Sequence, residues 1–215
     1  MPGSTPATSS ASSSSASSPG SVAGHPRSKA ADRLLDATRD ALLEGEGEVE
    51  MSDLARRAGV SVGLAYHYFR NKAGLLAAVI GAFYDRYDAV ANQRYDGAVD
   101  WSTRERARLE ATIDFLYADP MAPLVLGRMS RTAEVAEAEQ ARFLSMLDLS
   151  RRNIEDGQKR GFIPASIDAG IASAAIAGAC RMSFIQAMRA RQRPDAGQLA
   201  DQLWRMIAGA LRLSA

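Results

Sequence analysis

The sequence predicts an all-α protein, and three observations lead to this fold class. Apolar residues recur every three to four positions, which is the spacing of one face of an α-helix. No segment alternates apolar and polar residues with the period of two that marks a half-buried strand. Residues that favour helix ends, such as Ser61, Gly161 and Asp168, interrupt the helical pattern at intervals. We therefore expect a succession of helices of unequal length.

The first helices are short. Periodicity predicts a helix at about 34–42 and another at about 51–58, followed by a tight turn at Gly59. A further helix spans about 61–69, and Asn71 is expected to cap a long fourth helix. The apolar stripe of that fourth helix is Leu75, Leu76, Val79, Ile80, Phe83, Tyr87 and Val90.

Longer helices follow Trp101, which lies at a break in the pattern. They are expected at about 109–116, 124–129, 132–160, 168–191 and 195–212. The longest low-charge run, 169–180, is too short to span a membrane, so no membrane partner is expected.

Residues 1–28 differ from the rest because they are mostly Ser, Ala, Gly, Thr and Pro with almost no charge. Such a segment buries too little apolar surface to offset its ordering entropy, so we expect a disordered tail. It lacks the basic start and apolar core of a secretory signal. Arg27 and Lys29 either reach DNA or are solvated residues that precede the first helix, and the second interpretation is the simpler one.

Composition excludes several functions. The 26 basic and 25 acidic residues nearly cancel, so any contact with nucleic acid has to come from a local arrangement. Cys180 is the single cysteine, which rules out an intrachain disulfide and suits the reducing cytoplasm. With only two histidines, His25 and His67, no metal site is expected. No acid–base pair, nucleophile arrangement or phosphate loop is visible, so we expect no catalytic residue and no cofactor.

Residues 52–72 predict two short helices joined by a tight turn. Two short helices joined at Gly59 allow the second helix to cross the first steeply and project outward. Leu54, Ala55 and Ala58 are expected to face inward, while Ala65 and Phe69, four residues apart, anchor the second helix. The residues left on its outer face and exposed end are Val62, Gly63, Leu64, Tyr66, His67 and Tyr68. A recognition helix meets base edges and phosphates with such a face.

This segment resembles the signature of the TetR (tetracycline-repressor) family of transcriptional regulators. The matching residues are Leu54-Ala55, Ala58-Gly59-Val60-Ser61, Tyr66, Tyr68-Phe69, Lys72 and Leu75-Leu76. The match covers about a quarter of the chain and is specific, because these residues agree at fixed spacing without gaps. The resemblance implies an N-terminal three-helix helix-turn-helix domain and a C-terminal helical bundle for ligand binding and dimerisation. Accordingly, we expect a tail at 1–28, a DNA-binding domain at 29–88 and a ligand-binding and dimerisation domain at 89–215.

The resemblance also implies roles for single residues. The implied DNA-binding residues are Ser61, Val62, Gly63, Leu64, Tyr66, His67, Tyr68 and Lys72. Residues 62–64 would face bases, and because they lack the side chains that make bidentate base contacts, thymine methyls and DNA shape would carry more of the specificity. Tyr66, Tyr68 and Lys72 would hold phosphates. The alternatives are that the two tyrosines belong to an aromatic core and that His67 is an ordinary exposed histidine.

Two residues depart from the family pattern. Glu50 stands near the usual threonine cap, which weakens the start of the helix or shifts it to Ser52. Ala65 is smaller than the usual apolar residue and leaves less anchoring. The glutamates of 44–50 would repel phosphates, so we expect them to point away from DNA.

The C-terminal region is expected to hold an effector and to form a dimer. Residues 199–211 carry two neighbouring apolar stripes, and Ala172, Ala175, Ala179 and Ser183 allow another helix to approach closely. The alternative is a thick core within one subunit. The resemblance implies an effector pocket, for which the candidates are Phe115, Tyr117, Met121, Phe143, Met146, Leu147, Arg181 and Phe184. A stripe of Met and aromatic residues is, by itself, more often plain core.

Three hypotheses follow. The leading one is a homodimeric repressor that binds a double-stranded DNA operator and is released by a small, largely hydrophobic effector. The second is a DNA-binding protein of the same fold without a small-molecule effector. The third is an all-helical enzyme, which no residue pattern in the sequence supports.

Overall fold

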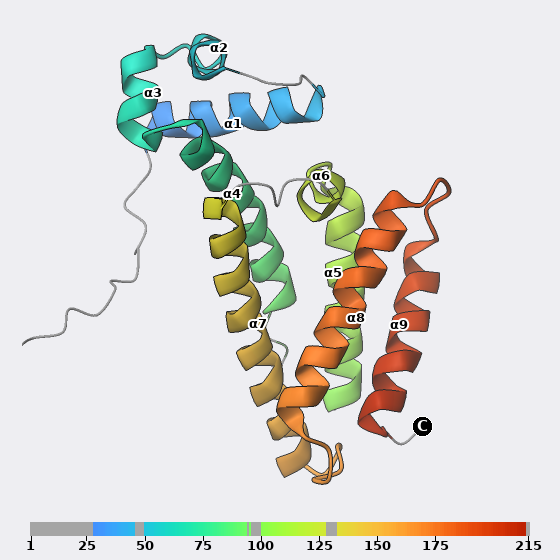
Figure 1. Cartoon of the computed structure of the whole chain (residues 1–215). Helices are drawn as coiled ribbons and strands as arrows, with labels where there is room; N and C mark the ends of the chain where they lie inside the picture. Colours follow the sequence, from blue (N-terminus) through green and yellow to red (C-terminus); the bar gives the residue numbers. More distant parts are fainter. Residues whose placement is uncertain (1–27, 46–49, 94, 96–99, 128–132, 214–215) are drawn as a thin grey trace, which may run out of the picture.

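The computed structural model describes residues 28–45, 50–93, 95, 100–127 and 133–213. Within these ranges the chain forms nine α-helices and no strand, as Figure 1 shows, which confirms the all-α prediction. The predicted tail lies outside the described residues except for Ser28. That serine is the N-cap of the first helix, because its Oγ accepts a hydrogen bond of 3.3 Å from the backbone N–H of Ala31.

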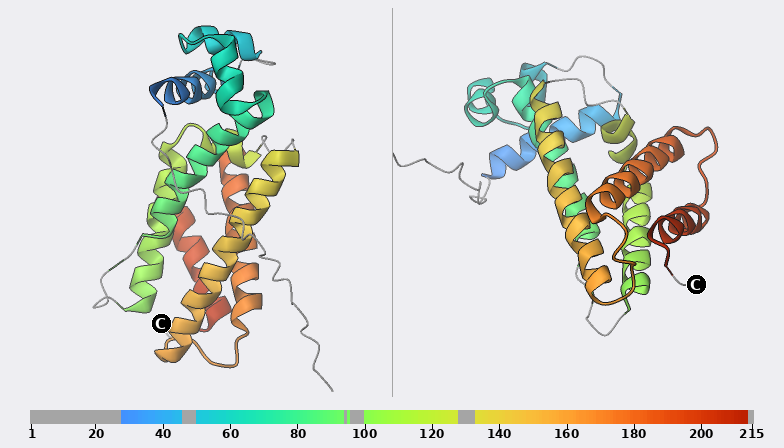
Figure 2. Two further views of the ribbon diagram at one scale, coloured as in Figure 1. Left: turned by 90° about the vertical axis from the view of Figure 1, so that its left-hand side faces the viewer. Right: turned by 60° about the horizontal axis from the view of Figure 1, so that its bottom comes forward.

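The N-terminal helices gather at one end of the molecule (Figure 1). They are α1 (Lys29–Leu43), α2 (Met51–Arg57) and α3 (Val62–Phe69). Helices α1 and α3 pack on α4 (Lys72–Ala91), while α2 packs on α1 and α3. The predicted inward residues Leu54, Ala55 and Ala58 are all buried. The fourth helix then continues into the other half of the molecule, so it belongs to both regions (Figure 2). The expected domain boundary at 88/89 falls within this continuous helix.

The second half is a bundle. It contains α5 (Trp101–Ala118), α6 (Ala122–Gly127), α7 (Ala133–Lys159), α8 (Ala169–Arg189) and α9 (Ala196–Leu211). The second half of α4 lies against α5 and α7, while α8 packs on α6, α7 and α9 (Figures 1 and 2). Asp100, Asp168 and Asp195 cap α5, α8 and α9 by accepting hydrogen bonds from backbone N–H groups of the first turn.

Trp101 belongs to the core of this bundle, although its place at a break in the sequence pattern gave no hint of that. The side chain is 2% exposed, and its Nε1–H donates to the carbonyl oxygen of Asn153 at 3.1 Å. Gly157 makes the approach of α5 and α7 feasible here, because a Cβ at that position would lie 3.1 Å from the indole nitrogen and 2.7 Å from Cδ1 of Ile163. The start of α5 is thus fixed against the end of α7.

The last two helices bear on two predictions. The two apolar stripes expected at 199–211 both contribute to the core, and part of their combined width is exposed. The buried residues Leu199, Ala200, Leu203, Ile207 and Leu211 are drawn from both stripes, and Met206 and Ala210 are exposed. The expectation that no segment is long enough for a membrane is wrong, because α8 continues through Arg181 for 21 residues and is apolar enough by composition. Here α8 packs on other helices, with Phe184 and Ala187 buried.

Candidate functional site

A tight turn positions α3 on α2. Gly59 has a φ of +63°, which a residue without Cβ adopts at no steric cost, and the N–H of Val60 bonds to the carbonyl of Ala55 at 3.0 Å. Ser61 then caps α3, since its Oγ accepts from the N–H of Leu64 at 3.2 Å. The crossing of the two helices therefore follows from local signals in the sequence.

The two faces of α3 differ sharply. Ala65 is completely buried, and Phe69 packs against the core, as predicted. On the other face Val62, Tyr66 and Tyr68 are 41%, 49% and 37% exposed. The exposed residues of this helix and its cap are Ser61, Val62, Gly63, Tyr66, His67 and Tyr68, while Leu64 is half-buried. The alternative that Tyr66 and Tyr68 form an aromatic core is therefore wrong.

The turn from α3 into α4 is unusually close. Arg70 has φ +58° and ψ −47°, and the N–H of Asn71 bonds to the carbonyl of Phe69 at 2.6 Å. The side chain of Asn71 caps α4 by accepting from the N–H of Gly74 at 2.7 Å. A Cβ on Gly74 would lie only 2.4 Å from the carbonyl oxygen of Phe69. Glycine thus lets the start of α4, with half-buried Lys72, press against the end of α3.

The charged residues of α2 are paired on the surface. Arg56 bonds to Asp53 at 2.9 Å and Arg57 to Glu44 at 2.7 Å. Arg57 therefore holds one of the glutamates that we expected to point away from DNA, whereas residues 46–49 lie outside the described residues. Glu50 precedes α2 without a capping hydrogen bond from its side chain, so the helix starts there and not at Ser52.

Two cavities open inside the bundle. The larger cavity has a volume of about 340 Å³ and lies among α4, α5, α7 and α8. The smaller cavity, about 90 Å³, is bounded by α4, α6, α7 and α8. Both are lined by the same five residues, Tyr87, Met146, Ala177, Cys180 and Phe184. The two spaces are therefore neighbours that share a wall.

Comparison with known proteins finds a family match in the N-terminal region. The sequence profile of bacterial regulatory proteins of the tetR family matches residues 34–79, which span the turn, α3 and the start of α4. Residues 34–79 are thus similar to the DNA-binding region of tetR-family regulators. This confirms the resemblance inferred from the motif around Gly59 and Ser61.

Curated relatives match the same part of this chain. The HTH-type transcriptional regulator BetI of Escherichia coli (strain UMN026) is 40% identical over 84 residues, which cover 38% of this chain and 42% of that protein. BetI of Klebsiella pneumoniae (strain 342) is 42% identical over 76 residues, covering 34% of this chain and 38% of that one. The matched stretch thus spans about two fifths of the relatives' length.

Solved structures resemble the whole fold. The fatty acid degradation regulator FadR of Bacillus halodurans has a TM-score of 0.69 at 20% identity and covers 88% of this chain and 100% of its own. SmeT, the repressor of a Stenotrophomonas maltophilia multidrug efflux pump, has a TM-score of 0.70 at 21% identity, covering 84% and 89%. At these identities the likeness concerns the fold, an N-terminal helix-turn-helix domain followed by a helical domain.

The structure divides the predicted effector residues into two groups. Met146 and Phe184 line both cavities, and Phe143 and Arg181 line the smaller one. The other four candidates, Phe115, Tyr117, Met121 and Leu147, line neither.

Each of those four side chains has another place. Phe115 stacks with the rings of Phe83 and Tyr87, with centroids 5.7 and 6.2 Å apart. The hydroxyl of Tyr117 donates to the carbonyl of Pro194 at 2.9 Å. Met121 is 1% exposed in the core, and Leu147 lies where α7 meets α8. The structure therefore places these four side chains outside both cavities. Aromatic and Met residues on a helix mark its buried face without distinguishing core from cavity.

Several cavity residues were missed by sequence reasoning. Tyr87 and Cys180 are central to both cavities, and Arg108 lines the larger one. Tyr87 was expected on the apolar stripe of the fourth helix, and its hydroxyl was the available signal that this stripe borders a cavity. Arg108 was a second signal, because it lies one helical turn before the buried Thr112 on α5 and so places a charge near the buried face.

Burial controls the titration of the cavity residues. The hydroxyl of Tyr84 donates to Glu139 at 2.8 Å, and burial together with this carboxylate raises the pKa of Tyr84 to about 12. Burial also raises the pKa of Tyr87 far above its ordinary value. The pKa of the Cys180 thiol is raised to about 11 for the same reason. Cys180 is therefore protonated at neutral pH and is a poor nucleophile and metal ligand.

Proposed function

We propose that the chain is a homodimeric transcriptional regulator that binds operator DNA with α3 and is released by a small, largely apolar effector. The observation that carries the proposal is the outer face of α3, where exposed Val62, Tyr66 and Tyr68 lie beside the start of α4. Large aromatic side chains that are exposed on a rigidly anchored helix need a partner. A major groove admits such a helix.

The contacts divide by chemistry. Residues 62–64 meet base edges through apolar contacts, so shape and thymine methyls contribute to specificity. The hydroxyls of Tyr66 and Tyr68 and the ammonium of Lys72 meet phosphates, as do the free N–H groups at the start of α4. His67 is exposed on the same helix, and its ring centroid lies 5.5 Å from that of Tyr68. In this arrangement His67 contacts the DNA backbone next to Tyr68.

Dimerisation is supported by the outer face of α8. Ile171 and Met182 are 73% and 62% exposed, and among the described residues no large apolar side chain is more exposed. Between them lie exposed Ala175 and partly exposed Gly178, small residues that allow a second helix to approach closely. Met206 and Ala210 of α9 are exposed as well. A second copy that covers this face with its own α8 and α9 removes the apolar surface from water. It also places two recognition helices about one DNA turn, ~34 Å, apart.

The effector role is supported by the larger cavity and its contact with α4. Its volume of about 340 Å³ is in the range of small-molecule sites. A solved complex of SmeT with triclosan shows that a protein of this fold holds an apolar aromatic compound. Tyr87 on α4 lines both cavities, and Lys72 begins the same helix. An effector that favours one position of α4 changes DNA affinity, and the coupling must be reciprocal.

The proposal is tested at Gly63, which is exposed at the start of α3. A Cβ there meets nothing within 4 Å, and an acidic residue in the first helical turn is favourable for the helix, so Gly63→Glu folds. Its carboxylate would face the phosphates and bases. Genomic fragments are selected with the native protein, and their affinities are measured by fluorescence anisotropy for native, Gly63→Glu and Gly63→Ala proteins.

We expect Gly63→Glu to lose at least about a hundredfold in affinity for the selected fragments, because a charge is brought against the polyanion without a partner. Gly63→Ala is the matched control and should stay within about tenfold of native affinity. Equal binding by native and Gly63→Glu proteins would rule out α3 as the recognition helix. Specific DNA binding that no compound alters would favour the regulator without a small-molecule effector.

A further inference from the structure

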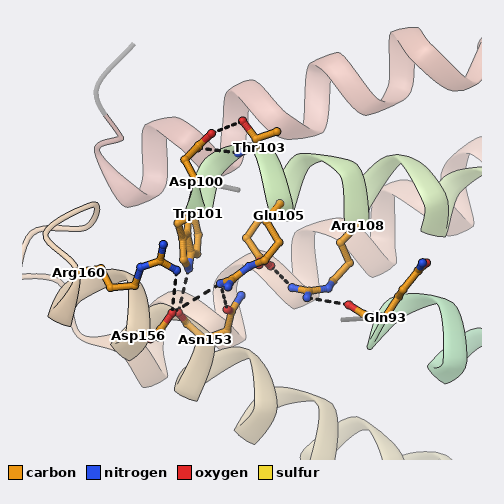
Figure 3. Close-up of polar contacts among 10 residues, drawn as sticks. Gln93, Asp100, Trp101, Thr103, Glu105, Arg108, Asn153, Asp156 and Arg160 are labelled. Atoms are coloured by element: carbon orange, nitrogen blue, oxygen red, sulfur yellow. Dashed lines mark hydrogen bonds and ion pairs between the residues drawn. The ribbon is translucent and has the colours of Figure 1, made fainter. Parts of the chain in front are cut away.

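The larger cavity has an apolar body and one polar end. Leu109, Ile176 and Phe184 belong to the body. Asn92, Glu105, Arg108, Ser150 and Asn153 provide the polar groups. Figure 3 shows how α5, α7 and the segment after α4 contribute to this end through Arg108, Asn153 and Gln93.

Among the described residues, one N–H donor of Arg108 has no hydrogen-bond acceptor. Its Nη1 pairs with Glu105, its Nη2 donates to the carbonyl oxygen of Gln93 at 3.1 Å, and its guanidinium lies 5.7 Å from the ring centre of Tyr95. The Nε–H is buried and, among the described residues, has no hydrogen-bond partner. A buried donor without an acceptor costs about 1–3 kcal/mol, more when charged, so an acceptor supplied by a ligand would be favoured there.

Arg108 shares its carboxylate partner with a second arginine. Arg104 and Arg108 share one carboxylate, Glu105, and the three side chains are only 15%, 23% and 13% exposed. Asp156, half-exposed, lies 3.7 Å from Arg104, but it is also 3.6 Å from Arg160 (Figure 3). Each of these two carboxylates is therefore shared between two guanidiniums, and among the described residues Arg108 pairs with no carboxylate of its own. Asp100 is directed to Thr103 at the start of α5.

We propose that the larger cavity binds a carboxylate amphiphile, with its apolar chain against Ile176 and Phe184 and its carboxylate accepting a hydrogen bond from Nε of Arg108. An anion at this end gives Arg108 an acceptor that it does not share with Arg104, whereas an ammonium head would be repelled by the guanidinium and a neutral head would make a weaker hydrogen bond. At about 30 Å³ per water molecule, a cavity of about 340 Å³ holds roughly eleven water-sized groups. An eight-carbon carboxylate, octanoate, fits this space.

This inference rests on the proposed effector role and adds a route from ligand to DNA. Arg108 holds the carbonyl of Gln93, which follows the last turn of α4. A carboxylate that accepts a hydrogen bond from the same guanidinium changes the contact between Arg108 and Gln93 at one end of α4. Lys72 is at the other end of the same helix, in the DNA-binding site. Ligand and DNA therefore act on one continuous element.

The experiment compares octanoate with octan-1-ol, which has the same chain and no charge, by titration calorimetry of the full chain without DNA. Octanoate is expected to bind at least about tenfold more tightly, since hydrogen bonds to charged groups contribute about 1.5–3 kcal/mol. Equal affinities, a preference for octan-1-ol, or no binding of either compound would overturn the proposal.

Variants assign the preference to Arg108. Arg108→Gln should remove the preference for octanoate while octan-1-ol still binds. Arg106→Gln is the matched control, because Arg106 is on the same helix but pairs with Glu110 and Asp201 outside the cavity. Arg108→Lys keeps the charge without the planar fork and should reduce the preference, which decides the matter if Arg108→Gln fails to fold. An unchanged preference in either Arg108 variant contradicts the role of this residue.

The test is independent of DNA binding. Octanoate binding in a protein that fails to select DNA would refute the proposed regulator and leave the carboxylate site standing. Selective DNA binding without octanoate binding would do the reverse.

Discussion

The helix-turn-helix region and the bundle are filled with different side chains. Alanines occupy much of the interior of the first region, where Ala31, Ala41, Ala55, Ala58 and Ala65 are all buried. The bundle uses large side chains such as Tyr87, Met146 and Phe184, and both described cavities lie among them. Small side chains let backbones approach closely and leave little freedom, whereas long flexible ones fill space irregularly. The closely packed first region thus suits the proposed contact with DNA, and the more adaptable bundle suits the proposed effector.

The bundle also differs in what it leaves exposed. The largest exposed apolar side chains of the whole described chain, Ile171 and Met182, are on α8. On α3 the exposed aromatic residues Tyr66 and Tyr68 carry hydroxyls, which suit a polar partner such as phosphate. The α8 face carries no such groups between Ile171 and Met182, which suits an apolar partner. Each surface therefore indicates its own kind of partner.

The largest expected effect breaks the proposed contact between copies. Ala175→Glu on α8 buries an unpaired carboxylate in both halves of a symmetric interface, so the dissociation constant should rise at least about a hundredfold. Analytical ultracentrifugation at micromolar concentration should then detect monomers. Ala89→Glu, at an exposed alanine of α4, should remain a dimer. An unchanged dimer in the Ala175→Glu variant would show that α8 is not at the interface.

The next effect tests the close packing of the first region. Gly74→Ala forces a Cβ to within 2.4 Å of a backbone oxygen, which cannot rotate away, so the free energy of unfolding should fall by about 1–3 kcal/mol. Gly81→Ala, on the same helix with nothing within 4 Å, should raise it by about 0.5–1 kcal/mol. Chemical denaturation measures both. If the two variants respond alike, the contact between α3 and α4 is looser than the geometry indicates.

The motif residues were predictable because their placement depends on near neighbours. Ser61 caps α3 through Leu64, and Gly59 makes the turn, so the exposed side of the helix follows from residues within one turn of it. The turn that contains Arg70 and Gly74 could not be predicted from near neighbours in the same way. The close approach of Gly74 to Phe69 depends on how one helix enters the next, and the sequence showed only that glycine is present.

The cavities were predicted poorly because their walls come from helices far apart in the chain. Tyr87 and Cys180 meet across 93 positions, and no local pattern determines that register. Phe115 and Arg108 lie on one side of α5, seven residues apart, yet only Arg108 reaches the cavity. Whether a side chain of the buried face contacts a ring or a cavity is decided by packing between helices, and periodicity cannot reveal it.

A smaller effect distinguishes phosphate contact from base recognition at Lys72. Lys72→Ala should weaken binding to all DNA sequences about equally and reduce the slope of log affinity against log salt by about one unit. The slope is measured by anisotropy between 50 and 200 mM salt on selected and unrelated duplexes. Lys159→Ala, at the exposed end of α7, is the matched control and should leave the slope unchanged. A loss confined to the selected duplex would mean that Lys72 contacts bases.

The smallest effect concerns strain at Arg70, between the two helices of the DNA-binding site. Its φ of +58° with ψ −47° is costly for a residue with a Cβ, by about 1–3 kcal/mol. Glycine relieves the strain but loses more entropy on folding, about 0.5–1 kcal/mol. The free energy of unfolding of Arg70→Gly should therefore rise by about 0.5–1 kcal/mol. Arg152→Gly, an exposed position inside α7, has ordinary helical geometry and should lose about 1 kcal/mol.

Denaturant titration of the two glycine variants tests the strain at Arg70. Arginine is replaced by glycine in both variants, and the free energy of unfolding is expected to rise at position 70 and to fall at position 152. Loss of stability in both variants would mean that Arg70 is not strained in solution. A gain at Arg70 alone would place stored strain in the rigid region, at the turn that sets Lys72 against α3. Such strain persists only where the surrounding packing over-determines the backbone, which the approach of Gly74 to Phe69 provides.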